Sequence, residues 1–112
     1  MASFERFDVV RVPFPFADRQ AEMNRPALVI SAAAAFNRAA GHSVMAMITS
    51  ASHTPWPLDV AIGDPGAAGL PAPSIVRFKL FTLDHRLVRG KLGRLGEKDR
   101  VRMQKALRRL LV

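Results

Sequence analysis

Two polar side chains stand next to apolar runs that are typical of buried strands. Arg25 comes directly before Pro26 and the apolar run 27–30, and Thr49 ends the largely apolar run 43–49. If the two strands run antiparallel across the segment between them, these two ends lie side by side. A guanidinium fork can donate two hydrogen bonds to the oxygens of an anionic group, and a hydroxyl adds a neutral donor. The pair is therefore a candidate site for binding an anion.

The stretch 24–31 is the element around which we expect the rest to be organised. Four consecutive apolar residues fit a strand that is buried on both faces. Pro26 can stand at the first position of such a strand, because a strand end need not supply every hydrogen-bond donor of the sheet. A rigid core strand would hold Arg25 at its first residues, where a scaffold can present a charge to a ligand.

The remaining sequence predicts several short strands and two helices. We expect strands at 7–12, 43–49, 56–62, 74–83 and about 87–89, and helices at 32–40 and about 97–110. Ser31 can cap the first helix and Gly41 can stop it, while the prolines after residue 12 should end the pairing of the first strand. Many short strands, with one helix inserted and one at the end, predict a mainly β fold with short helices, a small and strongly bent barrel or sandwich.

Side-chain periodicity assigns faces to two of these elements. In the expected strand 74–83, Phe78 and Leu80 would face the core, whereas Arg77 and Lys79 would share an outward face. The expected terminal helix carries one apolar stripe, formed by Met103, Ala106, Leu107, Leu110 and Leu111. Its acids Glu97 and Asp99 fall in the first turn, where the helix dipole favours them.

The composition indicates one basic domain that spans 1–112. The chain has 112 residues, a net charge of +8 and a sequence pI near 11.5, which favours a polyanionic partner such as nucleic acid or an acidic protein segment. The positive excess is concentrated after residue 76, where the acids are only Asp84, Glu97 and Asp99. We therefore expect the partner to be an acid.

Other features narrow the class of protein. There is no cysteine, which excludes disulfides, thiol catalysis and thiolate metal sites and fits a cytoplasmic location. No apolar run approaches the roughly 20 residues that span a bilayer, and charges stand where a signal peptide needs an apolar core. The three histidines (His42, His53 and His85) lack the spacing of metal ligands. We expect no metal, no cofactor and no membrane partner.

An ordered set of short segments resembles the MazF/PemK toxins. These segments are 9–10, 12–16, 25–31, 36–37, 48–50, 69–70, 73–74 and 92–95. The resemblance covers nearly the whole chain, and the ordered set is more specific than any one segment. It implies an SH3-like barrel with a C-terminal helix, a homodimer, and a metal-independent, sequence-specific endoribonuclease that acts on single-stranded RNA. It also implies a cognate antitoxin whose acidic, disordered segment blocks the active groove.

Position by position, the resemblance places the family's active residues on this chain. Its active arginine falls on Arg25, its active threonine or serine on Thr49 with Ser50 adjacent, and a further RNA-binding arginine on Arg77. The chain departs from the family pattern at Phe7, where members often carry glycine. It departs again at Gln20, where a glutamate or histidine is often found.

Metal-free RNA cleavage requires three tasks, which these residues can divide. The 2′-hydroxyl must lose a proton, the phosphorane must be stabilised, and the leaving 5′-oxygen must be protonated. Arg25 suits the second task, Thr49 adds a donor, and Glu22 is the favoured proton acceptor. Lys79, Ser50, His53 and Arg19 complete the expected RNA contacts. Trp56 is interpreted as core or dimer packing in preference to a base-stacking platform.

Two alternative functions remain open on the same scaffold. One is a protein inhibitor like the gyrase-poisoning CcdB toxins, which use an aromatic residue near the C-terminus, whereas the stretch 108–112 has none. The other is a non-catalytic barrel that binds nucleic acid, which the charge alone would support. Cleavage of mixed RNA by pure protein in EDTA separates an enzyme from both alternatives.

Overall fold

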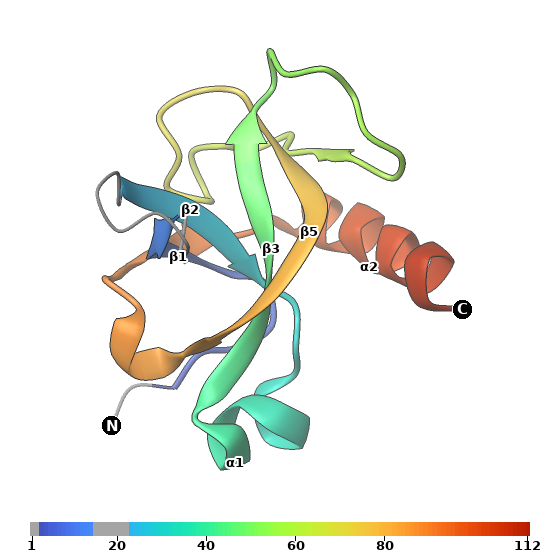
Figure 1. Cartoon of the computed structure of the whole chain (residues 1–112). Coiled ribbons are helices and arrows are strands. Elements are labelled where there is room, and N and C mark those ends of the chain that lie inside the picture. The colour runs from blue at the N-terminus through green and yellow to red at the C-terminus, as the bar shows by residue number, and fades with distance from the viewer. Residues whose placement is uncertain (1–2, 15–22) are drawn as a thin grey trace.

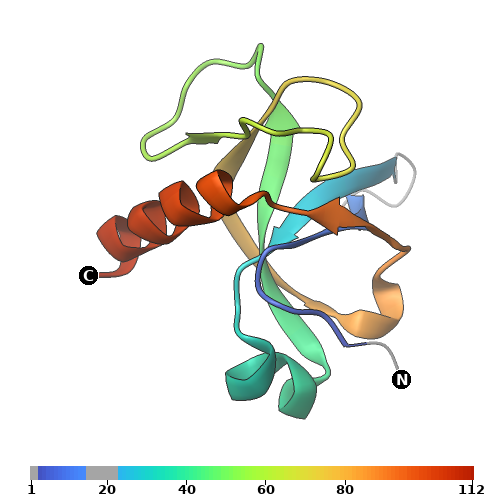
Figure 2. The ribbon, with the colours of Figure 1, turned by 180° about the vertical axis from the view of Figure 1, so that it is seen from behind.

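The computed structural model describes residues 3–14 and 23–112 (Figure 1). Its elements are β1 (Asp8–Phe14), β2 (Met23–Val29), the π-helical turn η1 (Ala33–Asn37), α1 (Arg38–Ala40), β3 (His42–Ser50), β4 (Val60–Ala61), β5 (Ser74–Asp84), the 3₁₀ turn η2 (His85–Leu87), β6 (Lys91–Arg94) and α2 (Glu97–Leu111). The strands form one antiparallel sheet in the order β4-β5-β3-β2-β1-β6. The sheet curls into a half-barrel, and α2 lies along one side of it (Figures 1 and 2). The prediction of a mainly β, bent fold with a C-terminal helix is confirmed.

Strand β2, which corresponds to the predicted stretch 24–31, is buried on both faces, as the sequence predicts. Ala27, Leu28 and Val29 have no exposed surface. Leu28 packs in the core cluster that α2 covers, while Ala27 and Val29 pack in a second cluster on the opposite face. The strand begins at Met23, however, so Pro26 lies inside β2 opposite Arg11 and not at its first position.

Strand β1 runs further than the sequence predicts. Pro13 and Phe14 pair with Asn24 and Met23 of β2, although prolines were expected to end the pairing. The other neighbour, β6, pairs only with residues 8–10 of β1. Pro13 therefore lies where β1 has a partner on one side, and its missing N–H can face the unpaired edge.

The segment 32–40 is helical, but its start is built differently from the prediction. Ala32 stands at the N-terminal cap position, and Ser31 does not cap the helix. Instead, the Ser31 hydroxyl donates to Oδ1 of the buried Asn37 at 2.5 Å and accepts from the N–H of Val44 at 2.9 Å. Gly41 ends the segment with φ of +65°, as predicted, because glycine adopts this left-handed conformation without a steric penalty.

Two short strands were predicted wrongly. Of the stretch 56–62 only Val60 and Ala61 are strand, because Asp59 closes a turn with Trp56: the Trp56 N–H donates to Oδ2 of Asp59, and the Asp59 N–H donates to the Trp56 carbonyl. The stretch around 87–89 is not strand: Leu87 ends the 3₁₀ turn η2, although the Arg89 N–H donates to the carbonyl of Arg11 in β1 at 2.7 Å. In contrast, 91–94, for which no strand was predicted, forms β6.

A bulge in β5 leaves the predicted faces of its side chains in place, but two of these side chains differ from the prediction in burial. Leu80 lies opposite Ala46, yet Arg77 lies opposite Met47, so β5 has two extra residues at this point. Two inserted residues keep the alternation of faces, since its period is two: Val76 and Phe78 pack in the core cluster that α2 covers, and Arg77 and Lys79 both lie beside the ring of Trp56. Arg77 is nevertheless buried, because its guanidinium contacts Asp59 and Thr54 of the loop 51–59, and Leu80, which was expected in the core, is 42% exposed. Lys79 is exposed, as predicted.

Phe7 has a backbone conformation that is unusual for a bulky residue. Its φ is +76° and it is 4% exposed, and such a conformation costs about 1–2 kcal/mol for a residue with a Cβ. The backbone around it is held in place, since the Phe7 N–H donates to the carbonyl of Val29 and its carbonyl accepts from the N–H of Leu95. Burial of the aromatic ring offsets this backbone strain. A glycine at this position would have no such strain, because it adopts positive φ without a steric penalty.

Helix α2 is fixed to the body by its first turn and by its first apolar residues. Asp99 is buried and accepts hydrogen bonds from the N–H groups of Gly63 and Asp64, at 2.9 and 3.0 Å, and from Arg102. Met103 and Ala106 are buried in the core, while the end of the predicted stripe, Leu110 and Leu111, is exposed. Among the described residues, no helix is long and apolar enough to cross a membrane.

The contacts of Asp99 predict an acid-labile anchor for α2. Burial raises the pKa of Asp99, but the hydrogen bonds from Gly63, Asp64 and Arg102 outweigh burial and hold it below the ordinary value of 3.8. The carboxylate therefore stabilises the fold above pH 3.8, and this contribution is lost as the pH falls below that value. Asp99→Asn should lower the free energy of unfolding at neutral pH by about 2–3 kcal/mol. The loss of stability between neutral and acid pH should also be smaller in this variant.

Urea titrations at several pH values measure both effects, with Glu97→Gln as the matched control, since Glu97 is an exposed acid in the same helical turn. An equal acid response in the wild type and Asp99→Asn would contradict the proposed role of Asp99.

Candidate functional site

Two hollows that share Arg25, Thr49 and His53 lie at the ends of β2 and β3. The larger has a volume of about 370 Å³ and extends to the loop 70–74. The smaller, of about 230 Å³, is also lined by Met47, Arg77 and Lys79. We call the two together the β2–β3 cleft. It is the place where the sequence predicted an anion site.

The register of the sheet brings Arg25 and Thr49 together. Ala27 of β2 lies opposite Met47 of β3 in an antiparallel pair, so a step of two residues along each strand reaches Arg25 and Thr49. Both line both hollows of the cleft. Nε of Arg25 is buried, and it has no hydrogen-bond partner within residues 3–14 and 23–112. A buried donor without a partner is costly, so this guanidinium is suited to bind a ligand that supplies acceptors.

Thr49 is coupled to a histidine by a short turn. The N–H of His53 donates to the carbonyl of Ser50, and Oγ1 of Thr49 is hydrogen-bonded to Nδ1 of His53 at 2.7 Å. Ser50 also lines the larger hollow, and its hydroxyl is hydrogen-bonded to that of Ser52 at 2.9 Å. The structure thus places a hydroxyl, an imidazole and a guanidinium around one cleft.

Arg77 borders the cleft, but its guanidinium is already engaged. Its Nε and Nη2 donate to the carboxylate of Asp59 at 3.2 and 2.9 Å, and Nη2 also donates to the carbonyl of Thr54 at 2.6 Å. This hydrogen-bonded pair lowers the pKa of Asp59 despite its burial, and it raises the pKa of Arg77. Arg77 therefore lies on the same face as Lys79, as predicted, but it is buried there and does not face solvent, and its fork ties the loop 51–59 to β5.

Trp56 lies on this loop and is not part of the core. The residue is 44% exposed, which contradicts the interpretation of Trp56 as core packing. The centroid of its ring is 5.4 Å from Cζ of Arg77 and 5.1 Å from Nζ of Lys79. Sequence reasoning also missed Asp59, whose partner Arg77 lies eighteen positions further along the chain.

Two of the predicted site residues, Glu22 and Arg19, lie outside the described residues, as does the departure at Gln20. The other predicted residues, Arg25, Thr49, Ser50, His53, Arg77 and Lys79, all line the cleft.

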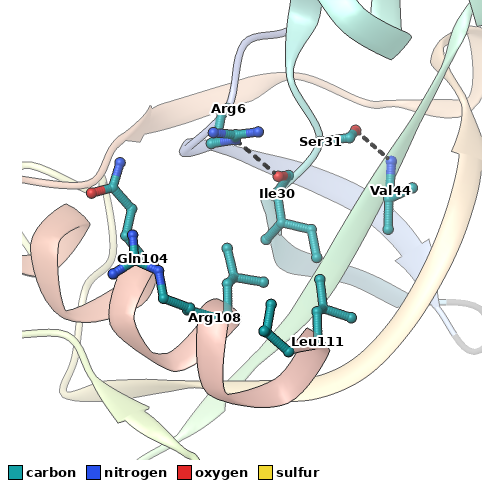
Figure 3. A pocket seen from close by; sticks show the side chains of 9 residues that line it. Arg6, Ile30, Ser31, Val44, Gln104, Arg108 and Leu111 are labelled. Atoms are coloured by element: carbon teal, nitrogen blue, oxygen red, sulfur yellow. Dashed lines mark hydrogen bonds between the residues drawn. The ribbon is translucent and has the colours of Figure 1, made fainter.

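A larger cavity, of about 560 Å³, lies elsewhere, between α2, strand β3 and the segment that follows β2 (Figure 3). Its lining is mostly apolar and includes Ile30, Val44 and Leu111. The hydroxyl of Ser31 at its edge is already bonded to Val44 and Asn37, and Arg6 donates to the carbonyl of Ile30 at 3.2 Å. Ser31 and Arg6 are thus engaged in the fold and the rest of the lining is mostly apolar, so we do not take this cavity as the chemical site.

The hydrogen-bonded pair of Ser43 and His85 has a structural role. Ser43 is hydrogen-bonded to Nε2 of His85 at 2.7 Å, but Ser43 has no exposed surface, and the ring of His85 packs edge-on against Phe4. Burial lowers the pKa of His85, with a further effect of the nearby His42. In the part of the chain that the structure describes, no group of three or more His, Cys, Asp or Glu could hold a metal ion.

Comparison with known proteins assigns the family. Residues 5–111 match the family described as the PemK-like, MazF-like toxin of type II toxin–antitoxin systems. The chain belongs to this family. No individual curated protein matches the chain. The predicted resemblance to MazF/PemK toxins is confirmed.

Solved structures of MazF toxins share the fold. MazF from Deinococcus radiodurans is 25% identical, with a TM-score of 0.74, and the match covers 99% of this chain and 98% of that one. An endoribonuclease from Mycobacterial species, solved in complex with its cognate antitoxin, is 23% identical, with a TM-score of 0.76 and coverage of 99% and 95%. The Mycobacterium tuberculosis toxin MazF-mt6 is 17% identical, with a TM-score of 0.69 and coverage of 89% and 91%.

Proposed function

We propose that this MazF-like protein is a metal-independent endoribonuclease that cleaves single-stranded RNA at specific sequences in the β2–β3 cleft. The observation that carries the proposal is Arg25, whose buried Nε lacks a partner among the described residues and which lines the cleft with the hydrogen-bonded pair of Thr49 and His53. Membership of a toxin family whose similar structures include an endoribonuclease supports the same conclusion.

The cleft supplies the groups that a phosphorane requires. In-line attack of the 2′-hydroxyl places an additional negative charge on the phosphate oxygens, and a guanidinium fork in a partly buried site stabilises this charge more than it stabilises the ground state. Arg25 performs this task, and Thr49 adds a hydroxyl donor. Glu22 accepts the proton of the 2′-hydroxyl, and His53, bonded through Nδ1 to Thr49, is positioned to protonate the leaving oxygen.

RNA contacts extend from the cleft along β5 and the neighbouring loops. Lys79 is exposed at the edge of the smaller hollow and binds phosphate, as do Ser50 and Arg19. Arg77 contributes differently from the original expectation, because its fork holds Asp59. Its charge is balanced by that of Asp59, and its contribution is to support the loop that carries His53.

The partners of this toxin follow from the same charges. An endoribonuclease of this fold was solved with its cognate antitoxin, and we propose that an acidic segment of an antitoxin occupies the basic β2–β3 cleft and excludes RNA. We also propose a homodimer, and we expect the toxin to act in the cytoplasm, where its RNA substrate is found. A non-catalytic nucleic-acid-binding barrel is the second candidate, and the net charge of +8 favours it.

The first prediction of the proposed function tests Arg25. Arg25→Ala should lower the rate of RNA cleavage in EDTA by at least about 10²–10³-fold, as expected for loss of a transition-state donor. Arg25→Lys should restore little, because one ammonium cannot make the forked contact. Cleavage is measured on a mixed RNA by purified protein, and circular dichroism checks the fold.

The matched control is Arg38→Ala, since Arg38 is an exposed arginine on α1, away from the cleft. Equal cleavage by the wild type and Arg25→Ala would identify the activity as a contaminant and would favour the non-catalytic candidate.

The second prediction concerns proton transfer. Glu22→Gln should lower the cleavage rate by about 10²–10⁴-fold and should remove the acid limb of the pH–rate profile, because general-base catalysis contributes about this much. His53→Asn should instead remove the alkaline limb. An unchanged acid limb in Glu22→Gln, together with its loss in His53→Asn, would reverse the two assignments.

The third prediction concerns the homodimer. Leu111 is 70% exposed and lines the apolar cavity beside α2, so burial against a second copy would remove apolar surface from water. Light scattering at about ten to a hundred micromolar, a range in which specific dimers persist, should give the mass of a dimer. Leu111→Asp should weaken it, whereas Val101→Asp, also an exposed apolar position on α2, should not. A wild-type monomer would contradict the proposal.

A further inference from the structure

Trp56 is held in a defined position beside the β2–β3 cleft by interactions that the catalytic proposal does not use. Its N–H donates to Oδ2 of Asp59 at 2.8 Å, and its carbonyl accepts from the Asp59 N–H at 3.2 Å. Asp59 is in turn fixed by Arg77 through a salt bridge whose side chains are 10% and 13% exposed. A pair so well shielded is screened little by solvent, so the backbone of Trp56 is anchored to β5.

The ring of Trp56 lies next to two cations and is partly exposed to solvent. Arg77 and Lys79, whose cationic groups lie 5.4 and 5.1 Å from its centroid, both come from β5. The residue nevertheless remains 44% exposed. An indole of this size is normally buried, and a large aromatic surface left in water on a rigid support is available for stacking.

The same two cations connect the ring to the cleft. Arg77 and Lys79 line the smaller hollow together with Arg25, Thr49 and His53. A strand of RNA whose phosphate lies at Arg25 would therefore meet Lys79 and then the indole as it leaves the hollow. Alternation of cationic and aromatic groups is the arrangement that binds single-stranded nucleic acid, because phosphates need charge and unpaired bases need a flat apolar surface.

We propose that Trp56 is a base-stacking subsite for the nucleotide that flanks the cleaved phosphate, pre-organised by the Arg77–Asp59 pair. The inference rests on the proposed function, since the base belongs to the RNA substrate. It assigns Arg77 the role of a positioning residue and Lys79 that of a phosphate contact. Stacking accepts every base, so this subsite adds affinity and fixes the path of the strand without selecting a sequence.

The fluorescence of the protein gives a direct test. Trp56 is the only tryptophan and there is no tyrosine, so intrinsic emission reports this one ring. The probe is a pool of short, mixed-sequence single-stranded RNAs that are 2′-O-methylated and so cannot be cleaved. A fully abasic strand of the same length supplies the same phosphates without bases. The RNA should quench the emission, whereas the abasic strand should leave it nearly unchanged.

Substitutions connect the signal to affinity. Trp56→Ala should weaken binding of the methylated RNA by about 5- to 100-fold, the range of one base–aromatic stack, and should leave binding of the abasic strand unaltered. Trp56→Phe should retain most of the affinity. Asp59→Asn should lower the fluorescence anisotropy of Trp56 and weaken RNA binding, because the anchor is lost. The control is Phe36→Ala: Phe36 is 39% exposed on η1, which with α1 lies at the bottom of Figure 1, while the loop after β3 lies at the top.

The outcomes separate this inference from the proposed function. Quenching by the methylated RNA, with no cleavage of unmodified RNA, would support the stacking subsite and contradict the proposed endoribonuclease activity. Cleavage of RNA with equal KM in the wild type and Trp56→Ala, and no quenching, would remove the subsite and leave the enzyme. Equal quenching by RNA and by the abasic strand would overturn stacking and would reduce Trp56 to a support for its two cations.

Discussion

The antiparallel register between β2 and β3, in which Ala27 lies opposite Met47, is the constraint on which the rest of the structure depends. Ala27, Leu28, Ala46 and Met45 have no exposed surface, so both strands are packed from both faces. A slip of one residue would move every side chain of a strand to the opposite face, and the core would have to be rebuilt. The relative position of Arg25 and Thr49 is therefore fixed by packing, without any direct bond between them.

The same principle explains which parts of the fold could be predicted from the sequence. The two central strands and α2 were predicted correctly, because a continuous apolar run or a regular apolar stripe reports burial directly. Strand β6 has no such run, since its residues Lys91–Arg94 are held by the edge of β1 and not by a core of their own. The strand expected at 56–62 fails because Asp59 stabilises a turn, which depends on Arg77 eighteen positions away.

The candidate site also has a part that could be predicted from the sequence and a part that could not. That Arg25 and Thr49 would be neighbours follows from local sequence and the usual antiparallel pairing. The burial of Arg77 does not, because it depends on the loop 51–59, whose Asp59 and Thr54 accept hydrogen bonds from its guanidinium. Such a contact between a strand and a distant loop has no reliable signature in a single sequence. The expectation that Trp56 packs in the core was wrong for a related reason, since a loop tied down by an ion pair leaves this large aromatic residue on the surface.

Arg25 also affects the stability of the protein before any ligand arrives. A buried Nε without a partner in the described structure, in a cleft wall shared with Arg77 and Lys79, makes the empty protein less stable than its packing alone would allow. Replacement by an apolar side chain of similar length would thus favour folding while it removed the proposed anion contact, which is the trade-off between stability and activity seen at many active sites. Any anion that enters the cleft restores the missing stability, by an amount that grows with its concentration relative to its dissociation constant. An antitoxin segment bound there would act as a folding partner as well as an inhibitor, and the toxin would be most vulnerable to unfolding when it is free to act.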